Sequence, residues 1–430
     1  MKIEKTTNKY LKTKNYICRK RKEKRMKIKD LKFDCRHFEG HIPCKPNKLH
    51  DVQCDDCSHY DKNTSSIIVL DTKQALLQEI FKICDFTKQE LVEEIPKIQT
   101  EVTRILFIKL GAIGDVIRTT PLLTKYKKEY GNCHFSWITH SPQVVPKDEV
   151  DVIYKWDASS VSVLANQEFD IAINLDKDKE ACMLLSLINA REKFGFLWKD
   201  GHVNTATDKA EHKLITGLFD HISKKNTLNY LEEIFEICHF EFNKEEYMIN
   251  LNEELSNQWK EKFKTLANSK TIIGLNTGCG LRWKTRLWPK EYWVELIKDL
   301  EKQGYFCLLM GGSDEDEMNR YYQSETGATY LGTFSLEEFI SITNNTDIIV
   351  TPVSMMMHIA LALKKQLMLF HNIFNVHEFE LYGRAVIIEP TSGCDCYFGN
   401  SCSREKRCMN DISVQDVLSN IAALNKNLKK

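Results

Sequence analysis

The chain has 430 residues, and its 60 Lys and Arg balance 60 Asp and Glu, so the formal net charge is zero. With 42% hydrophobic and 28% charged residues, it has the composition of a soluble globular protein of two or three domains. The neutral charge argues against a protein that coats nucleic acid, no apolar run reaches the ~20 residues that span a bilayer, and no secretory signal is visible. Because the chain also has 15 cysteines, we expect a cytoplasmic protein whose thiols are reduced or bound to metal.

Residues 1–32 form a basic tail with 14 Lys and Arg against 3 Asp and Glu. We expect this tail to be disordered, with attachment to anionic lipid or nucleic acid as the functional alternative. Met26 is an alternative start to Met1.

Residues 33–62 form a short Cys-rich segment that is too polar to make a core unaided. Its cysteines have the spacing C-x8-C-x9-C-x2-C and are Cys35, Cys44, Cys54 and Cys57. Because a C-x2-C pair can bind one metal ion tetrahedrally, we expect a structural zinc or iron ion here. Disulfides and unlinked thiols are the alternatives, and His37, His50 and His59 are substitute ligands or surface residues.

Residues 63–255 are expected to form a first Rossmann-like domain with leading helices. The predicted elements in chain order are helices at 72–85 and 88–94, a buried strand at 104–109, a glycine turn at 111–114, a helix from about Asp115, and strands at 134–139 and 170–175.

The same alternation of strands and helices restarts in residues 256–390. Strands are predicted at 271–275, 305–310, 347–351 and 366–370, and helices at 289–304 and 354–363. Residues 391–430 follow as a Cys-bearing tail and a closing helix. Two successive β/α series predict an α/β protein with two Rossmann-like domains facing a cleft, where ligands bind at the C-terminal ends of the strands.

The first candidate motif is KLGAIGDVIRTTP, which runs from Lys109 to Pro121. Gly111 and Gly114 allow the backbone to turn sharply off a buried strand and to approach a ligand closely. Asp115 then begins a helix, either as a general base or as a simple N-cap. The glycine spacing is not G-x-G-x-x-G, so a dinucleotide oxidoreductase is disfavoured.

The second motif, NTGCGLRWKTRLWP, runs from Asn276 to Pro289. Glycines and three cations after a strand indicate a diphosphate cradle, with an ordinary basic surface turn as the alternative. These residues are Gly278, Gly280, Arg282, Lys284 and Arg286. Trp283 and Trp288 are expected to be packing residues.

The third motif, VTPVSMMMHIALALKK, runs from Val350 to Lys365. Ser354 can cap a helix whose N-terminus presents free N–H groups to an anion. His358, one turn into this helix, is expected to be packed rather than catalytic, and the three methionines are expected to fill the core.

These motifs, together with MGGSDEDE and GTFSLEEF, occur in the order seen in glycosyltransferase family 9, the ADP-heptose:lipopolysaccharide heptosyltransferases. The resemblance covers about residues 104–418. It implies a GT-B fold and an inverting transfer of heptose from an ADP-sugar donor to a lipopolysaccharide-type glycolipid or glycan. Such an enzyme would be cytoplasmic or peripheral to the inner membrane, and its catalysis would need no metal cofactor.

The resemblance also assigns roles to individual residues. Asp115 falls on the family's proposed base, and Thr277, Gly278 and Arg286 fall on its diphosphate-binding positions. Glu315 maps to a ribose contact, and Phe334 to an apolar residue against the adenine, although a plain core role remains open for Phe334. The remaining predicted substrate-binding residues are Lys109, Gly114, Gly280, Ser354 and His358.

One departure from the family concerns the loop before His358. The family usually has an aspartate there that contacts the sugar, and this chain has Val353, which cannot accept a hydrogen bond. The alternatives are therefore another nucleotide sugar, a protein acceptor, or a non-catalytic scaffold that binds a sugar nucleotide.

A second group of cysteines lies in the C-terminal tail with the spacing C-x-C-x5-C-x5-C. It consists of Cys394, Cys396, Cys402 and Cys408. These cysteines either form a second metal site or pack as reduced thiols in a tight loop.

Overall fold

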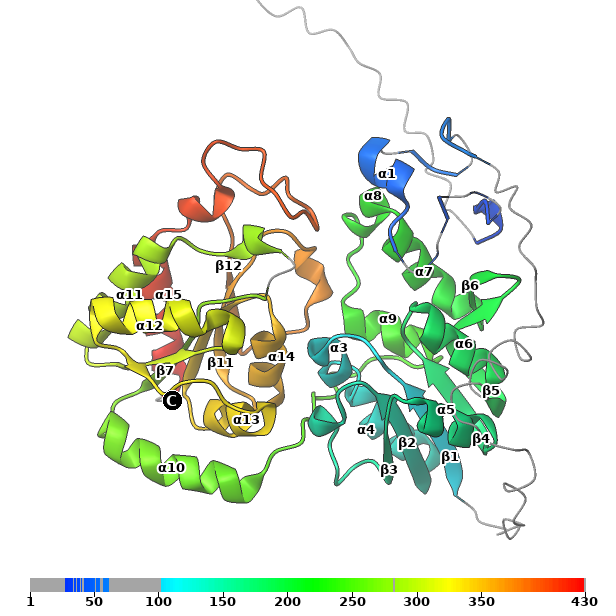
Figure 1. Cartoon of the computed structure of the whole chain (residues 1–430), viewed down its shortest axis with the longest axis horizontal. Coiled ribbons are helices and arrows are strands. Elements are labelled where there is room, and N and C mark those ends of the chain that lie inside the picture. Colours follow the sequence, from blue (N-terminus) through cyan, green and yellow to red (C-terminus); the bar gives the residue numbers. More distant parts are fainter. Residues whose placement is uncertain are drawn as a thin grey trace, which may run out of the picture.

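The computed structural model describes residues 28–33, 35, 37–38, 40, 42–50, 52–54, 57–61, 102–280 and 283–428. Most of the predicted basic tail and the predicted helices at 72–85 and 88–94 lie outside these residues. Figure 1 shows two α/β halves side by side, with a small N-terminal segment against one of them.

The N-terminal half is built on a six-stranded sheet in the order β3-β2-β1-β4-β5-β6. All neighbouring strands in this sheet are parallel except β5 and β6, which form an antiparallel pair. The strands are β1 (Thr103–Ile108), β2 (Cys133–Thr139), β3 (Val152–Lys155), β4 (Glu168–Asn174), β5 (Asn189–Lys199) and β6 (His202–Thr205).

Helices cover both faces of this sheet. They are α3 (Ile113–Ile117), α4 (Pro121–Tyr130), α5 (Ala158–Ala165), α6 (Lys179–Leu187), α7 (Glu211–Leu218), α8 (Asp220–Ser223) and α9 (Tyr230–Ile237). In β1, Leu106 and Ile108 share a core with α5 and α6, whereas Ile105 and Phe107 share a core with α4. Because both faces are buried, this strand is continuously apolar rather than alternating.

The C-terminal half has a second six-stranded sheet, which is wholly parallel and has the order β12-β11-β10-β7-β8-β9. Its strands are β7 (Ile272–Asn276), β8 (Phe306–Met310), β9 (Thr329–Tyr330), β10 (Ile348–Pro352), β11 (Gln366–Phe370) and β12 (Ala385–Ile388). Its helices are α10 (Glu253–Ala267), α11 (Lys290–Lys302), α12 (Asp316–Thr326), α13 (Leu336–Asn344), α14 (Met355–Ala362) and α15 (Val414–Leu428).

The predicted fold class is confirmed, since the protein is α/β with two parallel Rossmann-like sheets. Within the C-terminal half, one apolar face of α11 packs into the core. Trp293, Leu296, Ile297 and Leu300 are buried in one cluster with β7 and α15. Of the three methionines expected to fill the core, Met356 and Met357 are fully buried, and Met355 is partly buried and packs against that core.

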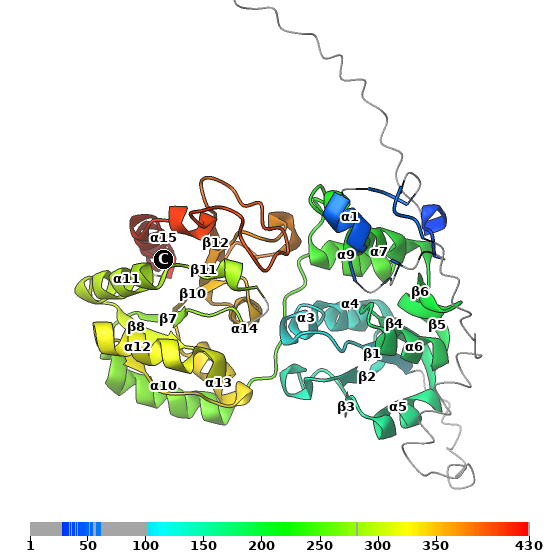
Figure 2. The same ribbon diagram turned by 45° about the horizontal axis from the view of Figure 1, so that its top comes forward.

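The two halves meet where α3 packs against α14, and both views show this contact (Figures 1 and 2). Residues 240–252 run between the halves without regular structure and are held on both sides. On one side, the Met248 N–H donates to Thr120 Oγ1 at 2.8 Å. On the other, Tyr382 Oη donates to the Glu245 carbonyl at 2.7 Å, and Arg384 forms a two-pronged ion pair with Glu246.

The N-terminal segment lies against α7 and α8 and contains α1 (Lys45–His50) and the 3-10 turn η1 (Ile28–Asp30). Its anchors are mostly polar: the Cys44 N–H donates to the Leu218 carbonyl at 3.0 Å, and Asn47 Oδ1 accepts from the Asp220 N–H at 3.1 Å. Among the described residues of the segment, Leu31 (5% exposed) and Pro46 are its buried apolar side chains.

In the described ranges, no helix is long and apolar enough to cross a membrane.

Candidate active site

Asp115 lies in the first turn of α3, next to the C-terminal half. The residue that caps this helix is Ala112, and no side chain makes the capping hydrogen bond, so the interpretation of Asp115 as a simple N-cap is wrong. The Asp115 carboxylate instead lies 2.7 Å from Nη2 of Arg118, and about a third of its side chain (33%) is exposed. Asp115 is therefore a reachable carboxylate at the junction of the two halves.

The charge state of Asp115 follows from its neighbours. Burial alone would raise the pKa of this carboxyl, but the cations Arg118 and Lys109 outweigh that effect and lower its pKa to about 2. Asp115 is thus ionised at neutral pH. An acid this strong makes a weak base unless Arg118 moves away.

Lys109 lies at the end of β1 and is 3% exposed. Its ammonium forms an ion pair with Asp176, whose Oδ2 also accepts hydrogen bonds from the backbone N–H groups of Leu110 at 2.5 Å and Gly111 at 3.0 Å. Burial would lower the pKa of Lys109, but Asp176 raises it well above its usual value. One buried carboxylate therefore fixes both Lys109 and the start of the glycine turn.

Gly114 brings the two halves into close contact. A Cβ atom at this position would lie 2.4 Å from Cδ2 of His358, so only glycine lets α3 approach α14 this closely. His358 is 7% exposed, and its Nδ1 has no hydrogen-bond partner. Burial, reinforced by the positive charge of Arg118, lowers the pKa of His358 to about 3. The expectation that His358 is a packed residue agrees with this burial.

The loop after β7 is tied to the loop after β10 by Asn276. Its side-chain amide donates to the Gly278 carbonyl at 3.0 Å and to Thr351 Oγ1 at 2.9 Å. Ser354 occupies the N-cap position of α14 but makes no capping hydrogen bond, since its hydroxyl lies 3.1 Å from Thr351 Oγ1. The N–H groups at the start of α14 are thus not capped by Ser354.

Gly278 lies directly against Glu315, which closes the 3-10 turn η5 (Ser313–Glu315) after β8. A Cβ atom on Gly278 would lie 2.1 Å from Glu315 Oε1, and Glu315 Oε2 accepts from the Gly312 N–H at 2.9 Å. Thr277 is held by a hydrogen bond from its hydroxyl to Asn319 at 3.2 Å. The structure therefore brings together three of the residues predicted to bind the nucleotide: Thr277, Gly278 and Glu315.

Thr277, Gly278 and Glu315, together with Gly280, which was also predicted to bind substrate, line a cavity of about 540 Å³ in the C-terminal half. Its other polar and charged lining residues include Lys284, Lys290, Asp314, Arg407 and Asn410. A volume of this size falls in the ~300–1,000 Å³ range of small-molecule sites.

Arg286, which closes the 3-10 turn η4 (Lys284–Arg286), is buried and does not line this cavity. Its guanidinium donates to the backbone carbonyls of Val353, Cys279 (2.5 Å) and Trp283 (3.3 Å). Burial lowers the pKa of Arg286. In the described structure this cation therefore holds the two loops together.

Phe334 lies apart from the other predicted residues. It lines a much smaller cavity of about 10 Å³ beyond Gly311, and its ring packs edge-on against Trp259 with centroids 5.4 Å apart.

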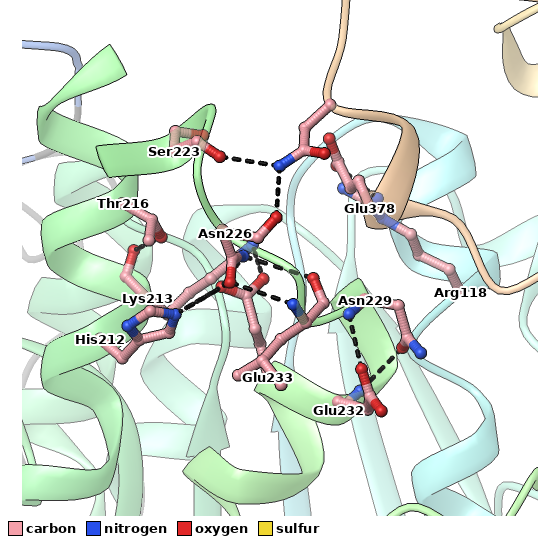
Figure 3. A network of polar contacts seen from close by, with 12 residues as sticks. Arg118, His212, Lys213, Thr216, Ser223, Asn226, Asn229, Glu232, Glu233 and Glu378 are labelled. Carbon is pink, nitrogen blue, oxygen red and sulfur yellow. Dashed lines mark hydrogen bonds and ion pairs between the residues drawn. The ribbon is translucent and has the colours of Figure 1, made fainter. Parts of the chain in front are cut away.

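Figure 3 shows a polar network centred on Asn226 and Glu233, with Glu378 and Arg118 at its edge. Arg118 Nη1 donates to Glu378 at 2.8 Å, in the 3-10 turn η6 (Val376–Glu378), and its guanidinium lies 3.6 Å from the centre of the Tyr230 ring. Nearby, the Asn375 amide donates to the backbone carbonyls of Ser223 at 2.8 Å and Asn226 at 2.7 Å. Through Arg118, the candidate base Asp115 is therefore connected to Glu378 in the opposite half.

Sequence reasoning missed four residues of this site: Arg118, Asp176, Asn276 and Glu378. Arg118 and Asn276 stand inside quoted motifs, so their position was a usable signal. Asp176 directly follows the strand predicted at 170–175, and functional residues of parallel sheets commonly lie at the C-terminal ends of their strands. Nothing in the local sequence singles out Glu378, which is 260 residues from its partner.

Every cysteine in the described part of the chain is a free thiol. Cys35, Cys44, Cys54 and Cys57 all line one small cavity. In the C-terminal tail, the Cys396 N–H donates to Cys394 Sγ at 3.4 Å, and Asn372 donates to Cys408 Sγ at 3.7 Å. Within the described ranges, no three His, Cys, Asp or Glu side chains are already arranged to hold a metal ion. Both metal sites remain predictions.

Comparison with solved structures identifies the fold. A family 9 glycosyltransferase from Veillonella parvula superimposes with a TM-score of 0.60 at 19% identity, covering 76% of this chain and 97% of that one. ADP-heptose lipopolysaccharide heptosyltransferase II from E. coli gives 0.59 at 16% identity, covering 76% and 100%. The E. coli heptosyltransferase WaaC with ADP-2-deoxy-2-fluoro heptose gives 0.53 at 14% identity, covering 75% and 99%. These likenesses establish the GT-B fold.

No curated protein matches the sequence. The profile of the family described as "Glycosyltransferase family 9 (heptosyltransferase)" matches residues 159–398, which is more than half of the chain. This match includes the 276–289 and 350–365 motifs but not the motif that contains Asp115. On this evidence, the chain belongs to glycosyltransferase family 9.

Proposed function

We propose that this protein is an inverting glycosyltransferase that moves heptose from an ADP-sugar donor to a hydroxyl of a lipopolysaccharide-type glycan. The observation that carries the proposal is the position of Asp115, an ionised and partly exposed carboxylate at the junction of the two halves. Family membership supports glycosyl transfer as the reaction. The E. coli WaaC structures with ADP and with an ADP-heptose analogue support an ADP-linked donor.

In the proposed reaction, Asp115 accepts the proton of the acceptor hydroxyl while the hydroxyl oxygen forms a bond to the anomeric carbon. The bond from that carbon to the diphosphate oxygen breaks, and its electron pair leaves with ADP. Because the acceptor attacks from the face opposite the leaving group, the anomeric configuration inverts.

The leaving diphosphate would be stabilised by groups at the C-terminal ends of β7 and β10. The backbone N–H groups of residues 277–280, the exposed cation Lys284 and the uncapped start of α14 all lie there. Donors fixed in advance stabilise developing negative charge without reorganisation. Arg286 would contribute indirectly by holding the Cys279 and Val353 loops in place.

Arg118 would control the strength of the base. While it pairs with Asp115, the carboxylate is a weak proton acceptor, and a shift of the guanidinium toward Glu378 would raise the pKa of Asp115. The acceptor would be a glycolipid presented at the inner membrane face.

Val353 supports a second candidate, a sugar-nucleotide-binding scaffold without transfer. Its side chain is buried and apolar, and its backbone carbonyl is engaged by Arg286, so it offers no polar side-chain contact to a sugar. A different donor sugar would also fit this change.

The experiment measures thermal unfolding of the full chain with ADP, ADP-heptose, UDP-sugars and GDP-sugars, and then transfer by product analysis. A ligand at about 100 times its Kd stabilises a protein by about 2.7 kcal/mol. We expect a shift with ADP, a larger one with ADP-heptose, and transfer that falls about 10²–10⁴-fold in Asp115→Asn while the ADP shift persists. Shifts without transfer in the wild-type protein would favour the scaffold, and preference for a UDP- or GDP-sugar would refute the ADP donor.

A further inference from the structure

The N-terminal segment gathers four cysteines around one cavity, although they are spread over 23 residues of sequence. Cys35, Cys44, Cys54 and Cys57 all line a cavity of about 20 Å³. This volume accommodates about one water molecule or one ion and is far too small for an organic ligand. The cavity is therefore of the size that a single metal ion requires.

The rest of the cavity wall is largely apolar. Phe38, Pro46 and Val52 contribute from the segment, and Leu218 and Phe219 contribute from the end of α7 and the residue after it. Thiols in such surroundings have little water to solvate them. A bound cation would neutralise several thiolates at once in a place where isolated charges are costly.

The main chain around three of the four cysteines is fixed by hydrogen bonds. The Cys35 N–H donates to the Lys32 carbonyl at 3.1 Å, the Cys44 N–H donates to the Leu218 carbonyl at 3.0 Å, and the Cys57 carbonyl accepts from the Tyr60 N–H at 3.2 Å. These bonds hold Cys35, Cys44 and Cys57 at the shared cavity without using their thiols.

The segment also lacks other means of holding its shape. Its described residues form one short α-helix and bury only two apolar side chains, Leu31 and Pro46, and its anchors are mainly polar. Small units that bury so little apolar surface commonly depend on metal or disulfide cross-links.

We propose that Cys35, Cys44, Cys54 and Cys57 bind one tetrahedral metal ion, zinc or iron, through four thiolates. The thiols must turn about their Cα–Cβ bonds toward the shared cavity, because no three of them already stand in a coordination geometry. Thiolate–metal distances of about 2.3 Å then bring the four sulfurs around one point.

The ion would have a structural role and would take no part in the reaction. Asn47 and Gln53 contact both ring nitrogens of His221 on α8, at 3.0 and 2.7 Å. Ser223, at the end of the same helix, accepts a hydrogen bond from Asn375 of the C-terminal half. The cross-linked segment would therefore support the part of the N-terminal half that contacts the other half.

The test measures metal content per chain in the purified full-length protein by elemental analysis. We expect Cys54→Ser/Cys57→Ser to lower the content by one ion per chain. The matched control, Cys394→Ser/Cys396→Ser, should leave that ion in place, and Cys57→His should retain it because three thiolates and one imidazole also hold zinc or iron. The metal that is lost distinguishes zinc from iron.

Refolding with Co²⁺ alone provides a second measurement that does not depend on activity. Tetrahedral thiolate coordination gives a near-ultraviolet thiolate-to-cobalt band and strong visible bands, which the Cys54→Ser/Cys57→Ser variant should lose. Metal content unaffected by this variant, or a wild-type protein with neither metal nor the cobalt spectrum, would overturn the proposal. Neither result would bear on glycosyl transfer by Asp115.

Discussion

Arg118 donates to Glu378 across the two halves of the protein at 2.8 Å while its other terminal nitrogen lies 2.7 Å from Asp115. A single guanidinium thus connects the candidate base to the opposite half. If the halves separate and the Glu378 contact breaks, Asp115 is the remaining carboxylate partner of Arg118. The pKa of Asp115, and with it the basicity of this residue, therefore depends on whether the two halves are in contact.

Replacing Arg118 with glutamine is expected to change the pH dependence of transfer. Without the guanidinium, the pKa of Asp115 rises from about 2 toward the usual ~3.9 of aspartate. The acid limb of the kcat/KM profile then moves to higher pH, because Asp115 becomes protonated sooner as the pH falls. Glu378→Gln is the matched control, since it keeps the Asp115–Arg118 pair, and an acid limb that moves equally in both variants would contradict the assignment.

Gly114→Ala is expected to impair the contact between the halves. The added methyl group would lie 2.4 Å from the His358 ring, and neither α3 nor α14 can yield without repacking. We expect kcat/KM to fall at least about tenfold, which corresponds to about 1.4 kcal/mol. Gly312→Ala is the control, because the nearest atom to its Cβ is 3.6 Å away. Near-normal transfer by Gly114→Ala would show that the close approach is not needed for catalysis.

His358 is expected to make the protein sensitive to acid. The pKa of His358 is about 3 in the folded state and ~6.5 in the unfolded state. Between these two pH values the unfolded chain binds more protons than the folded protein. The free energy of unfolding therefore falls as the pH drops from 6.5 toward 3. The loss is at most about 1.4 kcal/mol per pH unit. Urea unfolding from pH 7 to pH 4 should show a shallower decline in His358→Gln than in the wild type. The exposed residue His377 offers a control, and a decline in His358→Gln as steep as in His377→Gln would refute the prediction.

Arg286→Lys keeps the positive charge but loses the planar arrangement that serves the carbonyls of Val353 and Cys279. We expect the free energy of unfolding to fall by about 1–3 kcal/mol and ADP binding to weaken. Lys284→Met should weaken ADP binding without this loss of stability, because Lys284 is exposed at the cavity. Calorimetric titration with ADP and urea unfolding separate the two effects. Unchanged stability in Arg286→Lys would instead favour a direct phosphate contact.

The fold could be predicted from the sequence because the buried strands are largely apolar runs, and three of them, β1, β7 and β8, lead into glycine turns. The strand predicted at 104–109 is β1, Thr103–Ile108, and the helix predicted at 289–304 is α11, Lys290–Lys302. The helix expected from Asp115 instead begins at Ile113 and ends at Ile117, and a separate helix begins at Pro121. Proline favours the first turn of a helix, which explains the second start.

The site was harder to predict because its decisive contacts are long-range. A sequence pattern can place Arg286 beside a glycine loop, but it cannot show that the guanidinium is occupied by carbonyls from residues 279, 283 and 353. The same limit applies to the Lys109–Asp176 and Arg118–Glu378 pairs, whose members are 67 and 260 residues apart. The spacing of residues in a motif shows which charged side chains lie near a candidate site. The three-dimensional fold determines which of these side chains are already paired with distant residues.

The connection through residues 240–252 has a consequence for how substrate can enter and product can leave. On one side, Met248 is hydrogen-bonded to Thr120 of the N-terminal half. On the other side, Glu245 is hydrogen-bonded to Tyr382, and Glu246 forms an ion pair with Arg384. Because residues 240–252 are attached to both halves, they can act as a hinge. The halves can rotate about this segment, but they cannot easily slide past each other. Opening should therefore widen the gap on the side away from this connection. The α3–α14 contact should change least, because Tyr247 of the connection lies beside it with its ring centroid 6.1 Å from that of His358.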